Sequence, residues 1–450
     1  MKKKRQLFGT DGVRGKAGQY PLDPSTVTKI GYAAAQVFKK HMTSEFDPVI
    51  ILGMDTRQSG PSIRTSLIAG LSHGGLTVVD CDIITTPGIA YMTKTSRAVA
   101  GVVISASHNP YEDNGIKFFS HAGTKLPDEI ELEIEDALSD VAQPSQIKRE
   151  DGKHLVSRYI SFLASTVGGT EPLRGMRIVV DCGNGAAVAV APLLFKELGA
   201  DVIIVNNQPT GKNINEKCGA LYPENISAQV VSHHAACGVS YDGDADRVMF
   251  IDETGVVRDG DYLLAIMAIH LKKTGRLVNN TLVSTVMANL GLVRAMEREG
   301  IVVKQTAVGD RYVYEEMIKT GAIIGGEQSG HIILTDFLQT GDGILSSLQI
   351  LSILKSAGKP FSELAQTMQK YPQVLINARV AHKLPIEQLP HTQKAMSEAQ
   401  QELAHEGRVL VRYSGTENLL RVMIEGKDKS HINAMAQNIV DIALTELGKA

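Results

Sequence analysis

Cysteine is scarce in this chain, and its four copies form no recognisable site. Cys81, Cys182, Cys218 and Cys237 are scattered over 450 residues without a C-x-x-C pair. This spacing provides neither a zinc-ligand set nor a disulfide framework. We therefore interpret all four as reduced thiols.

Long apolar runs are also missing. No stretch reaches the roughly 20 apolar residues that a membrane-spanning helix needs. The basic residues 2–5 are followed by Gln-Leu-Phe-Gly-Thr-Asp, whereas a signal peptide continues with an apolar region of roughly 7 to 15 residues. We therefore expect a soluble chain that stays in the cytoplasm and has no membrane partner.

Neither charge sign is in excess, and several nucleotide and metal motifs are absent. The 46 Lys and Arg residues nearly balance the 49 Asp and Glu residues, for a net charge of -3. This balance argues against nucleic acid as a partner and leaves local basic sites for phosphate open. The sequence has no G-x-x-x-x-G-K-[ST] loop, no complete G-x-G-x-x-G and no H-E-x-x-H. A nucleotide-driven kinase or dehydrogenase is therefore disfavoured.

The chain does contain a repeated order of strand, helix and strand. It occurs within residues 49–80, 177–205 and 282–304, and each helix ends at a glycine, the residue that adopts the left-handed cap conformation without strain. The repetition predicts three α/β domains of related topology. After residue 371 the pattern changes to strands at 375–380, 408–412 and 420–425 and a helix at 431–447, which predicts a smaller α+β domain. The expected domains cover residues 1–150, 151–254, 255–370 and 371–450.

The stretch 105–110, Ser-Ala-Ser-His-Asn-Pro, places a serine where a buried strand ends. Residues 99–104 form a short apolar run typical of a strand covered on both faces. Pro110 and the residue before it prevent a helix or central strand from continuing. Ser107 is therefore expected on a loop held by a rigid strand, as a nucleophile. The alternative is an ordinary turn serine.

Three aspartates at alternate positions, Asp242, Asp244 and Asp246, are expected to point to one side of an extended loop. Their charges favour a divalent cation with oxygen ligands, and Mg²⁺ leaves room for phosphate. A calcium EF-hand has similar spacing, but its sixth position needs glycine and here is Arg247. A solvated acidic turn is the remaining alternative.

Two further loops carry groups suited to a sugar phosphate. The stretch 412–418 gathers an arginine, two hydroxyls and a glycine, with Arg421 nearby, and can donate to phosphate oxygens. The stretch 325–331 offers Glu327, Gln328 and Ser329 between glycines, which suit sugar hydroxyls. For both, a plain hairpin turn is the alternative. Arg14 and the Gly309-Asp310-Arg311 triplet are weaker signals of the same kind.

These four motifs, in this order, resemble the α-D-phosphohexomutases along the whole chain. Gln328 and the opening stretch 8–15 resemble the glucosamine branch more than the glucose or mannose branches. The resemblance implies three related α/β domains with mixed sheets plus a smaller C-terminal α+β domain around a central cleft. It implies an isomerase that interconverts glucosamine 6-phosphate and glucosamine 1-phosphate, through a phosphoserine and a bisphosphorylated sugar, for cell-wall precursors.

The resemblance also implies roles for the matching residues. Ser107 would be phosphorylated for activity, and its phosphate would hold one Mg²⁺ together with Asp242, Asp244 and Asp246. The other candidate catalytic residues are Arg14, His108, Lys117 and His331. The candidate substrate-binding residues are Glu327, Ser329, Gly309, Asp310, Arg311, Arg412, Ser414, Gly415, Thr416 and Arg421. Tyr413 and Asn418 stand where many relatives have prolines, which leaves the stiffness of that loop open.

Three other readings remain open on the sequence. The first is phosphoglucomutase or phosphomannomutase activity. The second is a non-catalytic sugar-phosphate binding protein, against which the intact Ser107 and three aspartates argue. The third is a phosphatase that releases phosphate to water. In each case the partner is a small sugar phosphate, and a homodimer is the assembly considered.

Overall fold

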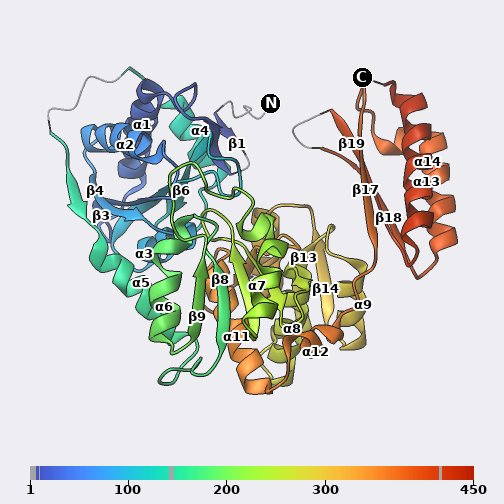
Figure 1. The fold of residues 1–450 in the computed structure, drawn as a ribbon. Helices are drawn as coiled ribbons and strands as arrows, with labels where there is room; N and C mark the ends of the chain where they lie inside the picture. Colours follow the sequence, from blue (N-terminus) through green and yellow to red (C-terminus); the bar gives the residue numbers. More distant parts are fainter. Residues whose placement is uncertain (1–6, 10, 141–145, 415–417, 450) are drawn as a thin grey trace. The chain divides into compact units, whose positions relative to one another are not determined.

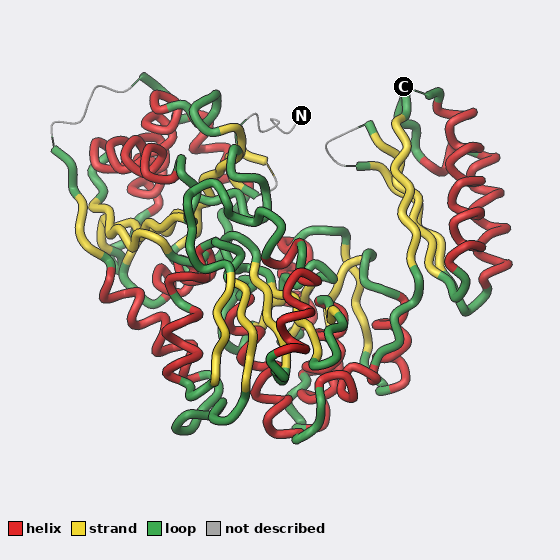
Figure 2. Tube along the Cα trace, viewed as in Figure 1, coloured by secondary structure: helices red, strands yellow, loops and turns green. Residues whose placement is uncertain are grey.

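The computed structural model describes residues 7–9, 11–140, 146–414 and 418–449. The chain divides into two compact units, Met1–Val286 with Ile301–Gln366, and Met287–Gly300 with Thr367–Ala450. Strands and helices alternate through the first unit, which contains three sheets (Figure 2). None of the helices in the described ranges combines the length and apolar character needed to cross a membrane.

The first sheet of the first unit has seven strands in the order β1-β2-β6-β5-β3-β4-β7. Strands β5, β3, β4 and β7 are parallel neighbours, and β6, β2 and β1 continue the sheet antiparallel. The strands are β1 (Phe8–Gly9), β2 (Gly12–Lys16), β3 (Asp47–Met54), β4 (Thr77–Ile83), β5 (Ala98–Ile104), β6 (Asp113–Ser120) and β7 (Arg149–Asp151). The helices are α1 (Pro24–His41), α2 (Gly60–His73), α3 (Thr86–Lys94), α4 (Asp128–Asp136) and α5 (Lys153–Ser165).

Side-chain alternation along β5 explains why helices cover both faces of this sheet. Ala100, Val102 and Ile104 belong to the core formed with α1 and α2, whereas Gly101 lies against Thr93 of α3. Figure 1 shows α1 and α2 on one side of the sheet and α3 and α5 on the other. Every residue of β5 is buried, as predicted for a strand covered on both faces.

The second and third sheets repeat this plan with fewer strands. Their orders are β12-β11-β10-β8-β9 and β14-β13-β15-β16. The strands are β8 (Arg177–Asp181), β9 (Asp201–Val205), β10 (Cys237–Tyr241), β11 (Val248–Asp252), β12 (Val257–Arg258), β13 (Thr281–Thr285), β14 (Val302–Thr306), β15 (Ile324–Gly326) and β16 (Ile332–Leu334). The helices are α6 (Ala191–Glu197), α7 (Ser227–Ser232), α8 (Gly260–Lys273), α10 (Asp310–Thr320), α11 (Gly343–Ala357) and α12 (Phe361–Leu364). The predicted mixed sheets and repeated strand-helix-strand order are confirmed.

The three sheets share one connection that matters for the site. In each, a strand with a parallel neighbour is followed by an antiparallel partner, and a short loop joins the two. Residues 105–112 join β5 to β6, residues 242–247 join β10 to β11, and residues 327–331 join β15 to β16. The serine, aspartate and glutamate motifs therefore occupy equivalent positions in three related sheets.

The predicted glycine caps are also confirmed. Gly75, Gly199 and Gly300 follow α2, α6 and α9 (Leu290–Arg298) with φ angles of 95°, 80° and 63°. These angles lie in the left-handed region that a residue with a Cβ rarely adopts. Each glycine lets the chain turn directly from its helix into the next strand.

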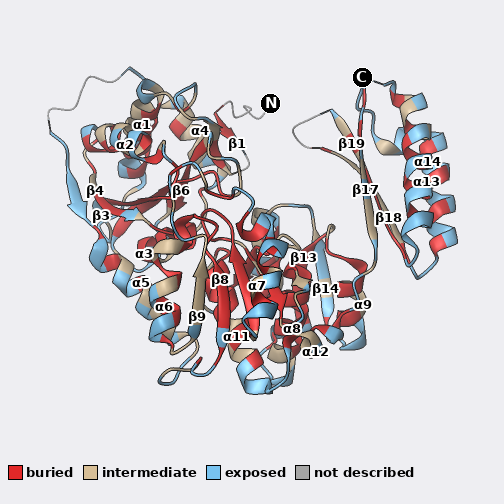
Figure 3. Cartoon of the chain, viewed as in Figure 1, coloured by how far each residue is buried: buried red, intermediate tan, exposed pale blue. Residues whose placement is uncertain are grey.

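The second unit contains a three-stranded antiparallel sheet in the order β17-β19-β18. Its elements are α9, β17 (Gln373–Arg379), α13 (Pro390–Leu403), β18 (Arg408–Tyr413), β19 (Leu419–Glu425) and α14 (Lys429–Leu447). The buried side of α14, including Ile432, Ile439 and Val440, belongs to the core under the sheet. Figure 3 shows the opposite side of α13 and α14 exposed. The predicted smaller α+β domain is confirmed.

Candidate active site

Ser107 lies on the loop after β5, as predicted, and its backbone is in the left-handed region with φ 50°. Its residue is only 2% exposed, and its hydroxyl donates to Asp242 Oδ2 at 2.6 Å. His108 Nδ1 lies 3.2 Å from the same hydroxyl oxygen. Burial and the positive charge of Arg247 lower the pKa of His108 to about 4. His108 is therefore neutral at neutral pH.

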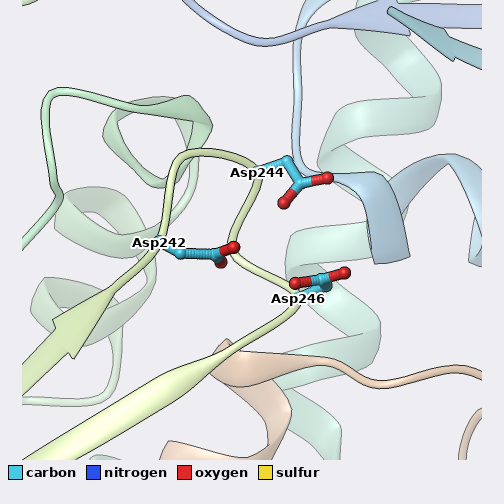
Figure 4. A group of neighbouring side chains, drawn as sticks. All are labelled: Asp242, Asp244 and Asp246. Atoms are coloured by element: carbon cyan, nitrogen blue, oxygen red, sulfur yellow. The ribbon is translucent and has the colours of Figure 1, made fainter. Parts of the chain in front are cut away.

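Figure 4 shows Asp242, Asp244 and Asp246 turned toward one another on the loop between β10 and β11. Each offers a carboxylate oxygen, and these atoms lie within 4.8 Å of one another. All three residues are buried. Burial, reinforced by the charges of Asp246 and Asp244, raises the pKa of Asp242 well above its usual range. The arrangement concentrates negative charge in the protein interior, where screening by solvent is weak.

Two oxygens of this trio, Asp244 Oδ1 and Asp246 Oδ1, are buried without a hydrogen-bond partner among the described residues. Buried acceptors normally have a partner, so these orphaned oxygens fit a bound cation. Thr86 holds the other oxygen of Asp244 by a 2.6 Å hydrogen bond. The trio could hold a metal ion. The EF-hand alternative fails, because a strand, β11, follows the loop where an EF-hand has a helix.

A series of side chains with alternating charge surrounds the trio. It begins at Asp244 and ends at Asp246. Its members in order are Asp244, Lys117, Asp11, Lys125, Asp310, His331 and Asp246. The successive nitrogen-to-oxygen distances are 3.0, 3.1, 2.5, 2.6, 3.7 and 3.5 Å. Arg14 also pairs with Asp11. Buried charges persist when they are paired in this way.

These pairings determine which groups carry protons. Burial alone would lower the pKa of Lys117, but Asp11 and Asp244 raise it above its usual value. Burial also opposes protonation of His331, yet Asp246 raises the pKa of His331. The same contact lowers the pKa of Asp246 against the effect of burial. Lys117 is therefore a persistently charged hydrogen-bond donor in this structure and not a base.

The loop with Glu327 lies beside the aspartate trio because two loops pair with each other. Arg247 and His331 form an isolated antiparallel bridge, and the Val248 N–H donates to the Gly330 carbonyl at 3.1 Å. A Cβ on Gly330 would lie 2.1 Å from the Val248 oxygen, so only glycine permits this approach. Glu327 Oε1 in turn accepts the Gly309 N–H at 3.0 Å.

Asp310 and Arg311 differ in their placement. Asp310 belongs to the series of charged side chains described above, whereas Arg311 pairs with Asp128 and, at 2.8 Å, with Glu315. Both residues line a cavity of about 280 Å³ that also reaches Lys125. Arg311 is therefore engaged by carboxylates at the rim of the site, and only Asp310 is brought to the buried cluster.

In the second unit, Arg412 and Arg421 face each other on neighbouring strands β18 and β19. Burial and the charge of Arg421 lower the pKa of Arg412. Arg421 Nε is buried without a hydrogen-bond partner among the described residues. Two opposed cations with an unused donor fit an anion. The Lys383 ammonium donates to the Ser414 carbonyl at 2.9 Å, while Gly415 and Thr416 lie outside the described residues.

Comparison with known proteins agrees with this geometry. Residues 5–145, 157–255 and 259–371 match the phosphoglucomutase/phosphomannomutase alpha/beta/alpha domains I, II and III, and residues 375–442 match the C-terminal domain. The phosphoglucosamine mutase of Syntrophotalea carbinolica is 49% identical over 99% of this chain and 98% of its own. The chain belongs to the phosphoglucomutase/phosphomannomutase family. A second family member, the phosphoglucosamine mutase of Carboxydothermus hydrogenoformans, is 50% identical over 97% of this chain and 99% of its own.

Solved structures of the family share the fold at low identity. The phosphoglucomutase/phosphomannomutase family protein from Burkholderia thailandensis has a TM-score of 0.80 at 22% identity, covering 99% of this chain and 98% of its own. The Aspergillus fumigatus N-acetylphosphoglucosamine mutase, in complex with GlcNAc-6P and magnesium, has a TM-score of 0.66 at 20% identity. It covers 98% of this chain and 96% of its own.

The sequence motifs did not reveal every residue around the site. Asp11, Lys125 and Thr86 hold the charged groups, and Arg57 and Asn215 contact the serine loop. Arg57 could have been predicted from the sequence, because it follows the buried strand β3 and therefore lies at the same sheet edge as Ser107. Thr86 gave none, since its partner Asp244 is 158 positions away.

Proposed function

We propose that this chain is a phosphoglucosamine mutase, an isomerase that interconverts glucosamine 6-phosphate and glucosamine 1-phosphate and supplies amino-sugar precursors for cell-wall synthesis. The observation that carries the proposal is the 2.6 Å contact between the Ser107 hydroxyl and Asp242 inside the aspartate trio. It supports a serine that carries a phosphoryl group next to a cation. Full-length relatives 48–50% identical to the chain bear this name.

The proposed cation is one Mg²⁺ per chain, held by the phosphate on Ser107 and by Asp242, Asp244 and Asp246. Hard oxygen ligands suit this ion, and the two orphaned carboxylate oxygens support it. When bound, Mg²⁺ supplies positive charge that neutralises the phosphoryl oxygens during transfer.

In the proposed reaction the bond between phosphorus and Ser107 Oγ breaks as a bond forms to the free hydroxyl of the sugar phosphate. The resulting sugar bisphosphate then reverses its orientation, and its other phosphoryl group is transferred to the oxygen of Ser107. The charged and proton-transfer groups around this step are Arg14, His108, Lys117 and His331. The long-range contacts that hold Lys117 and His331 support their assignment.

The substrate is proposed to bind through two further groups of residues. Glu327 and Ser329 would hold sugar hydroxyls, with Gly309, Asp310 and Arg311 beside them. The distal phosphate would bind Arg412, Ser414, Gly415, Thr416 and Arg421.

We also propose the domain limits 1–150, 151–254, 255–370 and 371–450. We propose a cytoplasmic location and a homodimer, and sedimentation of the purified chain tests the homodimer.

A competition assay tests the substrate assignment. Purified chain is primed with a sugar bisphosphate and Mg²⁺ and offered glucosamine 6-phosphate and glucose 6-phosphate together. We expect glucosamine 6-phosphate to be favoured more than about tenfold in kcat/KM, equivalent to ~1.4 kcal/mol in the transition state. Polar partners must decide between a 2-amino and a 2-hydroxyl group, because shape separates such near-isosteres poorly.

The controls separate the alternatives. Ser107→Ala should abolish turnover and phosphoryl uptake, as followed by intact mass. A preference for glucose or mannose phosphates would replace the glucosamine assignment by phosphoglucomutase or phosphomannomutase. Release of free phosphate without sugar 1-phosphate would indicate a phosphatase, and binding without turnover a non-catalytic protein.

A further inference from the structure

Arg57 lies directly beneath the serine loop and is completely buried. Its side chain is 0% exposed. Its Nε–H donates to Asp55 Oδ2 at 2.9 Å. The other four N–H groups donate to backbone carbonyls of Ser107, Asn109, Pro110 and Asp113. A guanidinium has five N–H donors, so every donor of Arg57 is used: three hold the serine loop and one holds Asp113, the first residue of β6.

The same loop is held through a second contact with Asp55. Asp55 Oδ2 accepts the Ser105 hydroxyl at 2.7 Å, and the Ser105 oxygen accepts the Ser107 N–H at 2.9 Å. The Arg57 guanidinium thus reaches the Ser107 carbonyl directly and the Ser107 N–H through Asp55 and Ser105. Both ends of the Ser107 backbone are fixed by one buried ion pair.

Ser107 needs such support because its own conformation is unfavourable. A φ of 50° is uncommon for a residue with a side chain and persists only where the surroundings impose it. Asn215, from the loop that follows β9, also donates to the Ser107 carbonyl at 2.9 Å. Gly243 of the metal-binding loop approaches the same carbonyl so closely that a Cβ would lie 2.5 Å from it. Three segments therefore meet at one carbonyl oxygen.

We propose that Arg57 is the positioning residue of the phosphoryl-transfer loop, and that Asn215 assists it from the second sheet. Together they hold Ser107 in the left-handed conformation that directs its hydroxyl at Asp242. Arg57 acts on the backbone of the loop, whereas the hydroxyl, the aspartates and the groups assigned to substrate have other partners. The proposal rests on the proposed function, because it assigns Ser107 to phosphoryl transfer.

This geometry predicts how the loss of Arg57 acts. A reacting oxygen displaced by about 1 Å can slow a reaction about 10²-fold, while contacts that bind the substrate elsewhere are unchanged. Lysine keeps the charge opposite Asp55, but its three donors radiate from one atom and cannot reach four carbonyls. Arg57→Lys should therefore lower kcat and leave KM nearly unchanged.

The experiment compares Arg57→Lys, Asn215→Gly, the double variant and Arg64→Lys as a matched control. Arg64 lies on α2, which packs against the same sheet, and it pairs with Asp82 rather than with the serine loop. Asn215→Gly keeps the backbone angle of 57° accessible and provides a milder variant should Arg57→Lys fail to fold. Steady-state rates, phosphoryl uptake from a sugar bisphosphate by intact mass, and amide hydrogen exchange of residues 105–113 are measured on the full chain with Mg²⁺.

We expect Arg57→Lys to lower kcat and the uptake rate at least about 10²-fold, with KM within about threefold. Exchange in residues 105–113 should rise at least about tenfold, and Asn215→Gly should show smaller changes in the same direction. Arg64→Lys should match the wild type. Unchanged kcat in a folded variant, a KM rise as large as the kcat loss, or unchanged exchange would each overturn the proposal.

The exchange measurement separates this proposal from the proposed function. If the wild type shows no mutase activity but the exchange difference is present, the function is wrong and the role of Arg57 in holding the loop stands. If the wild type is an active mutase and exchange does not respond to Arg57→Lys, the role of Arg57 is wrong and the function stands.

Discussion

At the scale of single residues, the site depends on which oxygens are left without partners. Asp242 Oδ2 is used by Ser107, and Asp244 Oδ2 by Thr86 and Lys117. The remaining oxygen of Asp244 and one of Asp246 are buried and have no hydrogen-bond partner in the part of the chain that the structure describes. One oxygen of Asp244 thus belongs to the protein frame and the other is available to a cation.

Asp244→Asn tests this division. The amide keeps the shape of the side chain but removes the charge, so the cation loses a ligand and Lys117 loses a partner. We expect kcat to fall about 10²-fold or more, as when one electrostatic contact is removed from a transition state. The Mg²⁺ concentration that gives half-maximal activity should rise. Activity is titrated with Mg²⁺ after exhaustive chelation.

The control is Asp201→Asn, which removes an exposed aspartate paired with Arg177. It should leave the Mg²⁺ titration unchanged. Equal Mg²⁺ dependence for Asp244→Asn and the wild type would contradict the assigned ligand.

At the scale of elements, α11 is held by a buried aspartate at its N-terminus. Asp342 Oδ1 accepts the Leu345 N–H at 2.9 Å, and Oδ2 accepts the Tyr159 hydroxyl at 2.7 Å. Burial raises the pKa of Asp342 to about 6. Helix α11, which contacts the second and third sheets, therefore begins at a carboxyl group whose ionisation is unfavourable.

The stability contribution of Asp342 should therefore depend on pH. The folded pKa of Asp342 lies above the unfolded value of about 3.9, so its contribution is complete below about pH 4 and is lost as pH rises through about 6. This difference in pKa corresponds to about 3 kcal/mol of unfolding free energy. In Asp342→Asn the new amide would not titrate and can keep both contacts, because the Tyr159 hydroxyl accepts as well as donates.

The measurement is the thermal unfolding midpoint of the wild type and Asp342→Asn at pH 4.5 and 7.5. We expect the wild type to lose stability relative to the variant at the higher pH. Asp23 caps α1 as the matched control, and its hydrogen bond with Thr26 lowers its pKa. Asp23→Asn should differ from the wild type by a nearly constant amount at the two pH values, because both lie above the unfolded value of about 3.9 and above the lowered pKa of Asp23. A pH-independent difference for Asp342→Asn would disprove the assignment.

At the scale of the whole molecule, the second unit is expected to contribute binding rather than chemistry. Its opposed cations, Arg412 and Arg421, lie on paired strands and offer donors to an anion. Binding one phosphate at a fixed place would let the same sugar be held in either of two orientations, as a mutase requires. Remote binding of this kind also helps to orient the reacting end.

Arg421→Ala should therefore lower kcat/KM about 10²-fold for both the 6-phosphate and the 1-phosphate, since hydrogen bonds to charged groups are worth roughly 1.5–3 kcal/mol. Lys427→Ala serves as control, because Lys427 is an exposed cation just beyond the other end of β19 and pairs with Glu406. Unchanged kinetics with both substrates in Arg421→Ala would move the phosphate site elsewhere.

The sequence alone predicted the fold class and the three loops that the first unit brings together, and the phosphate loop of the second unit stays a prediction. Buried strands, glycine caps and the alternate aspartates are local signals, because each is specified by the spacing of a few neighbouring residues. For this reason the strand before Ser107, the loop of Asp242 to Asp246 and the smaller last domain could all be predicted.

Only the tertiary structure decided which distant residues complete these loops. Asp11, Lys125 and Arg57 act through partners that the sheet order brings together, and a pairing between positions 50 to 185 residues apart leaves no periodic trace in the sequence. The partners of Arg311 are of the same kind, since only folding shows that it pairs with Asp128 and Glu315, and its predicted contact with substrate stays a prediction. The spacing of neighbouring residues determines which functional groups a loop carries. Long-range packing determines which of these groups are already paired within the protein and which can still bind a ligand.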